Sequence, residues 1–226
     1  MMDTHDYGEE GDSRGIEHEE AEHLLKVIEG RGRGIFLVFE GLDGSGTTTQ
    51  MELLAKDLRE EGLKVITTCE PTESPIGKAI DEILKGGMKI DNKSMMTLFA
   101  LDRKEHVKEI EGWLKEGYIV ICDRYYISSF TYQGMNAPEE ERLLMHVLNK
   151  DFLKPDLTIY IDALVDTCMG RIESRAEERE LFEKRETLEC VEAEYQKYGD
   201  DMYYVDGDGT VDDVSEEVRY ALWTIA

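Results

Sequence analysis

Short apolar segments alternate with amphipathic ones along most of the chain. Five segments are apolar and rich in β-branched or aromatic residues, as buried parallel strands are: residues 35–39, 64–68, 118–122, 157–161 and 203–205. Apolar residues at helical spacing lie between them, as at Met51, Leu54, Ala55 and Leu58. This alternation favours an α/β fold with a five-stranded parallel sheet flanked by helices. In such folds ligands bind at the carboxyl ends of the strands.

The first 33 residues follow a different pattern. Residues 1–14 are acidic and without periodicity, which predicts disorder. Apolar residues at helical spacing predict a short amphipathic helix over residues 16–29, and the glycines of residues 30–34 predict a hinge. We therefore divide the chain into an acidic extension, residues 1–33, and one α/β domain, residues 34–226. We expect that deleting residues 1–30 changes turnover by less than about threefold.

The charge balance restricts the partners. The chain of 226 residues carries 51 acidic and 26 basic residues, a formal net charge of −25. Such a field repels nucleic acid and anionic membranes, so we expect neither as a partner. No apolar run is long enough to span a bilayer or to act as a secretion signal. Four widely spaced cysteines predict reduced structural thiols and a cytoplasmic protein.

A glycine-rich segment lies between the first predicted strand and the first predicted helix. Residues 41–48 read G-L-D-G-S-G-T-T, in the strand, loop and helix context of a phosphate-binding loop. Glycines there let backbone amides approach an anion at a helix N-terminus, and the Thr48 hydroxyl occupies the position of a Mg²⁺ ligand. The predicted nucleotide-binding residues are Gly41, Gly44, Ser45, Gly46, Thr47, Thr48 and Thr49.

Thr47 departs from the pattern of this loop. The position ordinarily holds a lysine, which neutralises the β- and γ-phosphates during phosphoryl transfer. Thr47 offers a hydroxyl group but no charge. Either positive groups elsewhere in the chain take over this task, or transfer is slow.

Five ordered motifs together resemble those of the thymidylate kinase family. They are residues 39–50, 70–77, 97–103 (T-L-F-A-L-D-R), 123–134 (D-R-Y, S-S and Y-Q-G) and 155–162. The similarity runs in order from about residue 35 to residue 226. The resemblance implies a P-loop kinase with a helical lid over about residues 168–184. It also implies ATP- and Mg²⁺-dependent phosphorylation of dTMP to dTDP, and a homodimer formed through helices.

The resemblance assigns residues to the acceptor nucleotide. Phe99 would stack on the pyrimidine ring, although its pattern alone fits a core residue equally well. Arg103 would donate to a ring carbonyl such as O4 of thymine; the alternative is a surface ion pair with Asp102. Ser129 would bind the base edge, and Tyr132 would fill the position of a ribose 2′-hydroxyl. The remaining predicted substrate-binding residues are Glu70, Pro71, Arg124, Ser128 and Gln133.

Three charged residues near the ends of the first and third strands are candidates for the chemistry. Arg124 can grip the acceptor phosphate in bidentate fashion. Asp123 resembles the acid on the metal side of the site, or it orients Arg124. Asp43 within the loop binds Mg²⁺, its waters, or the arginine of the acceptor phosphate.

The predicted lid carries Arg171, Arg175 and Arg179 at a spacing of four residues, on one face if helical. The alternative is a solvated charged helix. Gly44 places the chain in the family subgroup in which lid arginines supply positive charge, which makes Arg175 and Arg179 catalytic candidates.

Two further departures concern positive charge. Cys69 and Asp81 occupy positions at which the family usually has arginines, and Lys78 is the available substitute. With Thr47, the site lacks up to three cations. Two alternatives to a dTMP kinase therefore stay open: a kinase for another pyrimidine monophosphate such as dUMP, and a nucleotide-binding protein of weak catalytic power.

Overall fold

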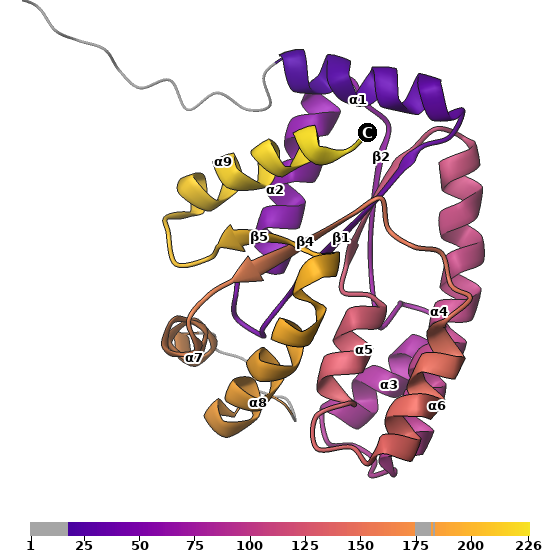
Figure 1. Ribbon diagram of the computed structural model, residues 1–226, viewed down its shortest axis with the longest axis vertical. Coiled ribbons are helices and arrows are strands. Elements are labelled where there is room, and N and C mark those ends of the chain that lie inside the picture. The colour runs from indigo at the N-terminus through magenta and orange to yellow at the C-terminus, as the bar shows by residue number, and fades with distance from the viewer. Residues whose placement is uncertain (1–17, 175–181, 183) are drawn as a thin grey trace, which may run out of the picture.

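The computed structural model describes residues 18–174, 182 and 184–226. Its strands form one parallel sheet in the order β2-β3-β1-β4-β5 (Figure 1). The strands are β1 (Ile35–Gly41), β2 (Val65–Cys69), β3 (Ile119–Asp123), β4 (Leu157–Asp162) and β5 (Tyr203–Asp206). The α/β prediction and all five predicted strands are confirmed. Each strand extends one or two residues beyond its predicted carboxyl end.

Helices connect the strands and cover the sheet. They are α1 (His18–Arg31), α2 (Thr47–Glu60), α3 (Pro75–Leu84), α4 (Asn92–Lys115), α5 (Tyr126–Tyr132), α6 (Glu139–Asn149), α7 (Val165–Ser174), α8 (Arg185–Tyr195) and α9 (Val211–Ala221), with short 3-10 helices η1 (Gln196–Asp201) and η2 (Leu222–Thr224). Within the described ranges, none of these helices combines the length and apolar character needed to cross a lipid bilayer.

Alternate side chains of β1 belong to two different cores. Ile35, Leu37 and Phe39 pack in one cluster with apolar residues of α2 and α9. Phe36 and Val38 pack in another with residues of α4. All seven residues of β1 are buried, which explains why the strand reads as a continuous apolar run instead of an alternating one.

The carboxyl ends of the strands face a group of helices. Figure 1 shows α3, α5, α6 and α8 gathered at this end of the sheet, and α1 at the opposite end beside the C-terminus. The loop between β1 and α2 and the residues after β2 and β3 emerge at the same edge, because the strands are parallel. The fold therefore brings the sequence motifs together where ligands of such sheets bind.

Helix α1 packs on the domain. Leu24 is fully buried and Ala21 is 3% exposed, both in the same core cluster as β1. His23 Nε2 lies 3.0 Å from the carbonyl oxygen of Ile225, and Arg31 contacts both Ala226 and Asp156. The helix expected over residues 16–29 is thus confirmed from His18 onward; residues 16 and 17, and the disorder expected for residues 1–14, lie outside the described residues. The expectation that residues 1–30 can be removed at little cost overlooked this packing, because their loss would expose core surface.

Arg33 anchors the start of the sheet. Its guanidinium donates to both carboxylate oxygens of Asp156 at 2.9 and 2.6 Å, and the backbone N–H of Phe36 donates to the same carboxylate at 2.8 Å. These contacts lie at the amino ends of the strands. Arg31 and Arg33 therefore stabilise the fold at the end of the sheet opposite the phosphate-binding loop.

Candidate active site

The loop between β1 and α2 has a backbone that requires glycine. Gly44 and Gly46 have positive φ values of 84° and 109°. A Cβ atom on Gly41 would lie 2.4 Å from Ser45 Oγ, and one on Gly44 would lie 2.6 Å from the carbonyl oxygen of Cys168. Helix α2 begins directly after Gly46 without a side-chain cap, which leaves its first N–H groups available to an anion.

A cavity of about 140 Å³ lies over this loop. Its lining residues are Asp43, Gly44, Gly46, Thr47, Thr48, Thr49, Asp123 and Arg124. Five of the seven predicted nucleotide-binding residues are among them. The other two, Gly41 and Ser45, do not line this cavity. Thr47 lines the cavity although it is only 6% exposed, and its hydroxyl offers a hydrogen bond but no charge.

Thr48 and Asp123 form the oxygen pair at which a hard cation fits. Thr48 Oγ1 donates to Asp123 Oδ2 at 2.5 Å, while Asp123 Oδ1 is buried and has no partner among the described residues. Hydroxyl and carboxylate oxygens beside a phosphate loop suit Mg²⁺. Of the two roles left open for Asp123, orienting Arg124 is disfavoured, since Arg124 pairs with Asp43; the metal-side role stays a prediction.

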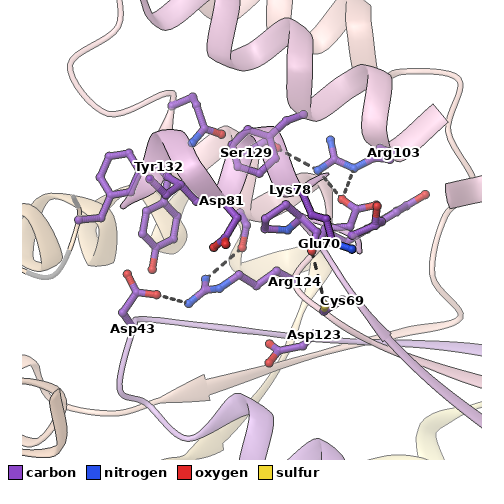
Figure 2. Close-up of a pocket in the computed structure, with 18 of the residues that line it drawn as sticks. Asp43, Cys69, Glu70, Lys78, Asp81, Arg103, Asp123, Arg124, Ser129 and Tyr132 are labelled. Carbon is purple, nitrogen blue, oxygen red and sulfur yellow. Dashed lines mark hydrogen bonds and ion pairs between the residues drawn. The ribbon is translucent and has the colours of Figure 1, made fainter. Parts of the chain in front are cut away.

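Arg124 has an unusual backbone, and its side chain makes three hydrogen bonds at the boundary of the cavity. Its φ of 67° lies in the left-handed region, which is rare for a residue other than glycine. Its guanidinium donates to Asp43 Oδ1 at 2.6 Å, to the carbonyl oxygen of Gly41 at 2.9 Å and to Ser128 Oγ at 3.2 Å. The ring of Tyr132 lies 5.1 Å from it. Figure 2 shows the guanidinium reaching Asp43.

A second cavity, of about 440 Å³, adjoins the first. All nine predicted substrate-binding residues line it: Glu70, Pro71, Phe99, Arg103, Arg124, Ser128, Ser129, Tyr132 and Gln133. Asp43, Asp123 and Arg124 line both cavities. They therefore form the boundary between a phosphate-binding space and a larger, partly apolar one.

Arg103 is buried at the wall of the larger cavity. Only 1% exposed, it donates to Glu70 Oε2 at 2.7 Å and to Ser129 Oγ at 3.0 Å (Figure 2). It also donates to Asn149 Oδ1 at 2.5 Å. These contacts fix the plane of the guanidinium. Its neighbour Phe99 is partly exposed to the cavity and packs against the small apolar cluster of α3 and α4.

The alternative ion pair between Arg103 and Asp102 is wrong. The Asp102 carboxylate accepts hydrogen bonds from the backbone N–H of Thr72 at 2.8 Å and from the Ser74 hydroxyl at 2.7 Å. It thereby holds the segment after Glu70-Pro71. Successive residues of α4 point in different directions. Asp102 therefore binds the segment that contains Thr72 and Ser74, while Arg103 lines the cavity.

Four residues that line the larger cavity have a buried polar atom without a partner among the described residues: Asp123 Oδ1, the Tyr125 and Tyr132 hydroxyls, and Gln133 Oε1. Gln133 is 4% exposed and Tyr132 is 7% exposed. Burial raises the pKa of the Tyr132 phenol well above its usual value, although Arg124 opposes this. Buried polar groups ordinarily have hydrogen-bond partners. A bound molecule that reaches the Tyr132 hydroxyl and Gln133 Oε1 would supply the partners that these atoms lack. Phe182 contacts the Tyr132 ring edge-on at 5.3 Å.

The residues that replace family arginines also line the larger cavity. Cys69 and Asp81 both face it, as does Lys78 (Figure 2). Lys78 lies 3.5 Å from the Glu73 carboxylate, and Asp81 pairs with Lys85 at 2.6 Å. The positive charge on this wall is therefore already partly compensated. Burial, followed by the charge of nearby carboxylates, raises the pKa of the Cys69 thiol to about 11.

The lid is only partly described. Arg175 and Arg179 lie outside the described residues, so the structure does not place them. Arg171 of α7 donates to the carbonyl oxygen of Ser45 at 2.7 Å and to that of Gly207 at 2.9 Å. It is thus a cation held directly against the backbone of the phosphate-binding loop.

Sequence reasoning missed the residues that support the site from behind. Glu40 is fully buried in β1, Tyr195 of α8 donates to it, and Asn149 of α6 holds Arg103. For Glu40 a signal existed, since a carboxylate within an apolar strand must be hydrogen-bonded to be buried. No local sequence pattern predicts the contact of Asn149 with Arg103 or that of Tyr195 with Glu40.

The sequence of this chain is similar to those of known proteins. The family model described as thymidylate kinase matches residues 39–218. A probable thymidylate kinase from Methanocaldococcus jannaschii is 37% identical over 80% of this chain and 90% of its own. A thymidylate kinase from Desulfotalea psychrophila is 41% identical over 70% of this chain and 78% of its own.

The fold has a counterpart among solved structures as well. The thymidylate kinase from Candida albicans superposes with a TM-score of 0.73 at 24% identity, covering 85% of this chain and 92% of that one. That likeness supports the fold, and the family match and the sequence relatives support the kinship. The chain belongs to the thymidylate kinase family.

Proposed function

We propose that this protein transfers a phosphoryl group from ATP to dTMP, giving dTDP and ADP. The observation that carries the proposal is the meeting of two cavities at Arg124, Asp43 and Asp123. One cavity has the glycine-rich loop and helix terminus that bind phosphates. The other has room for a nucleoside monophosphate. A donor and an acceptor bound in them would bring their phosphates together at this boundary.

The chain's own groups would then position both phosphates. The loop amides would hold the ATP phosphates, and Thr48 with Asp123 would hold Mg²⁺, which supplies charge neutralisation when bound. Arg124 would grip the acceptor phosphate while Asp43 fixes its orientation, in agreement with their 2.6 Å ion pair. Catalysis of this kind rests on alignment and charge stabilisation, with no covalent intermediate.

The base would be read on the wall opposite the loop. Arg103 has its guanidinium plane fixed by Glu70, Asn149 and Ser129 and can donate toward a ring carbonyl. Phe99 offers a ring for stacking. The free Oε1 atom of Gln133 can accept a hydrogen bond from a ring N–H. This set suits thymine, which has carbonyl acceptors on both sides of an N–H donor.

Product analysis tests the proposal. Incubation of the protein with ATP, Mg²⁺ and dTMP is expected to yield dTDP and ADP in equal amounts, as phosphorus NMR would show. ADP formation that does not depend on dTMP would contradict kinase function and would favour a nucleotide-binding protein of weak catalytic power. A preference for dUMP would move the assignment to that pyrimidine monophosphate.

We also propose that the protein is a cytoplasmic homodimer. On α6, Leu143 and Val147 are 59% and 62% exposed and lie one turn apart, so they share a face that a second copy could cover. Sedimentation velocity is expected to show a dimer at micromolar concentration, and Leu143→Lys combined with Val147→Lys to shift it to a monomer. A monomeric parent protein, at salt high enough to screen its negative charge, would contradict the dimer.

A further inference from the structure

Glu40 is a buried carboxylate that the proposed chemistry does not use. It lies one residue before Gly41 in β1 and is fully shielded from solvent. Its Oε1 atom accepts hydrogen bonds from the backbone N–H groups of Tyr125 and Ser128, at 3.0 and 3.1 Å. Its Oε2 atom accepts from the Ser128 hydroxyl at 2.5 Å and from the Tyr195 hydroxyl at 2.9 Å. A buried charge with so many donors has a specific structural task.

The first task is to hold the backbone that follows Arg124. Helix α5 begins at Tyr126 and has no side-chain cap of its own. Glu40 supplies the missing acceptor from β1, since it binds the N–H groups of Tyr125 and Ser128. On the other side, the Arg124 N–H donates to the carbonyl oxygen of Phe39 at 2.8 Å. The costly left-handed backbone of Arg124 is thus held on both sides from β1.

The second task concerns the Arg124 guanidinium itself. The Ser128 hydroxyl has a single proton, and at 2.5 Å that proton is donated to Glu40. The Ser128 oxygen therefore presents a lone pair to Arg124 Nη1, which lies 3.2 Å away. As the acceptor, the Glu40 carboxyl oxygen thus sets the direction of the serine hydroxyl, and the serine oxygen in turn accepts a hydrogen bond from the guanidinium.

We infer that Glu40 is a positioning residue for Arg124, acting through Ser128 and the first turn of α5. The inference rests on the proposed role of Arg124 in binding the acceptor phosphate. Glu40 does not reach either cavity and touches no substrate in this account. Its removal should therefore weaken use of the acceptor and leave the donor site nearly unchanged.

Glu40→Gln tests the inference with little change of shape. The remaining amide oxygen can still accept the two backbone N–H groups, while the new NH₂ group faces two hydroxyls and reverses the Ser128 hydrogen bond. We expect kcat/KM for dTMP to fall about tenfold or more, with KM for ATP within about twofold of the parent value. Ser128→Ala should have a similar effect, and the double variant should be little worse than either single one.

A matched control is Glu194→Gln. Glu194 is also largely buried and accepts two hydrogen bonds from Arg142, at 2.9 and 3.0 Å, but it lines neither cavity. The Glu194→Gln variant should have a lower melting temperature, without a selective loss of kcat/KM for dTMP. A purely structural Glu40 would give that same pattern, with both substrates affected in proportion to the folded fraction, and would overturn the inference.

Three further outcomes are distinguishable. If Glu40→Gln does not fold, Ser128→Ala still tests the inference, because it removes the hydroxyl that connects Glu40 to Arg124; an unchanged kcat/KM for dTMP would then overturn the inference. If Arg124→Ala itself leaves kcat/KM for dTMP unchanged, the proposed role of Arg124 is wrong. If Arg124→Ala is impaired while Glu40→Gln and Ser128→Ala are not, only the positioning role of Glu40 is wrong.

Discussion

At the scale of the residue, Thr47 raises the sharpest chemical question. It begins α2 at the position of the phosphate-loop lysine, and its side chain is buried. Among the described residues, Arg171 and Arg124 donate to backbone carbonyls of this loop. Both are engaged there, so they provide positive potential at the loop but have limited freedom to follow a γ-phosphate. The lid arginines Arg175 and Arg179 are the remaining candidates for that task.

We predict that Thr47→Lys partly replaces the lid arginines. Arg175→Ala or Arg179→Ala should lower turnover about 100-fold, which corresponds to about 2.7 kcal/mol of transition-state stabilisation. Adding Thr47→Lys should recover part of that loss, because the lysine would restore charge where the γ-phosphate binds. A double-mutant cycle on turnover measures the coupling. Strict additivity of Thr47→Lys with both arginine variants would show that the two regions do not share a task.

Cys69 gives a prediction that depends on pH. Two of the cysteines, Cys69 and Cys190, are exposed, so a Cys190→Ser background isolates the first. Partial desolvation, followed by the charge of nearby carboxylates, raises the pKa of the Cys69 thiol to about 11, and the reactive thiolate is therefore scarce at neutral pH. Alkylation by iodoacetamide should accelerate about tenfold per pH unit between about pH 8 and pH 10, and dTMP should slow it. A labelling rate that levels off below about pH 9 would disagree with this environment.

At the scale of the element, the strands were predictable and their ends were not. Apolar runs identified each strand, but β1, β3, β4 and β5 end in Glu40-Gly41, Asp123, Asp162 and Asp206. These polar residues and glycine break the apolar pattern and still pair within the sheet. Two of these residues lie at the candidate site or beside it: Asp123 lines both cavities, and Glu40 accepts hydrogen bonds from Tyr125 and Ser128. Apolar runs therefore predict strands that end one or two residues before the observed carboxyl ends.

Helix α1 shows a second limit of sequence reasoning. Its apolar spacing predicted a helix, but its docking partners Ile225 and Ala226 lie about 200 residues away, as the separation of 202 between His23 and Ile225 shows. No local pattern contains that pairing. The acidity of the preceding residues suggested a dispensable tail, whereas Leu24 is part of the main core.

We predict a clear difference between two adjacent leucines of α1. Leu24→Ala should lower the free energy of unfolding by about 2–5 kcal/mol, because it leaves a cavity in the core. Leu25 is 46% exposed, so Leu25→Ala should cost less than about 0.5 kcal/mol. Urea denaturation monitored by circular dichroism measures both. Equal values for the two variants would mean that α1 is not docked in solution.

At the scale of the whole molecule, a strongly acidic chain places three arginines at its candidate site, among carboxylates that also line it. The formal net charge is −25, yet Arg103, Arg124 and Arg171 are all gathered around the two cavities and the loop. Each is held by acceptors from elements distant in sequence. The motifs predicted which residues lie at the site, while the buried partners that orient them, Glu40 and Asn149, emerge only from the fold.

The most direct test of the account is the specificity of the purified protein for its acceptor. We expect kcat/KM for dTMP to exceed that for dCMP by about tenfold or more, because the buried Arg103 requires an acceptor where cytosine presents an amino donor. An unmet hydrogen-bonding group of this kind costs about 1–3 kcal/mol. ADP formation measured with dTMP, dCMP and no acceptor gives the comparison. Equal specificity constants for dTMP and dCMP, or equal rates with and without acceptor, would contradict the assignment of this site to dTMP.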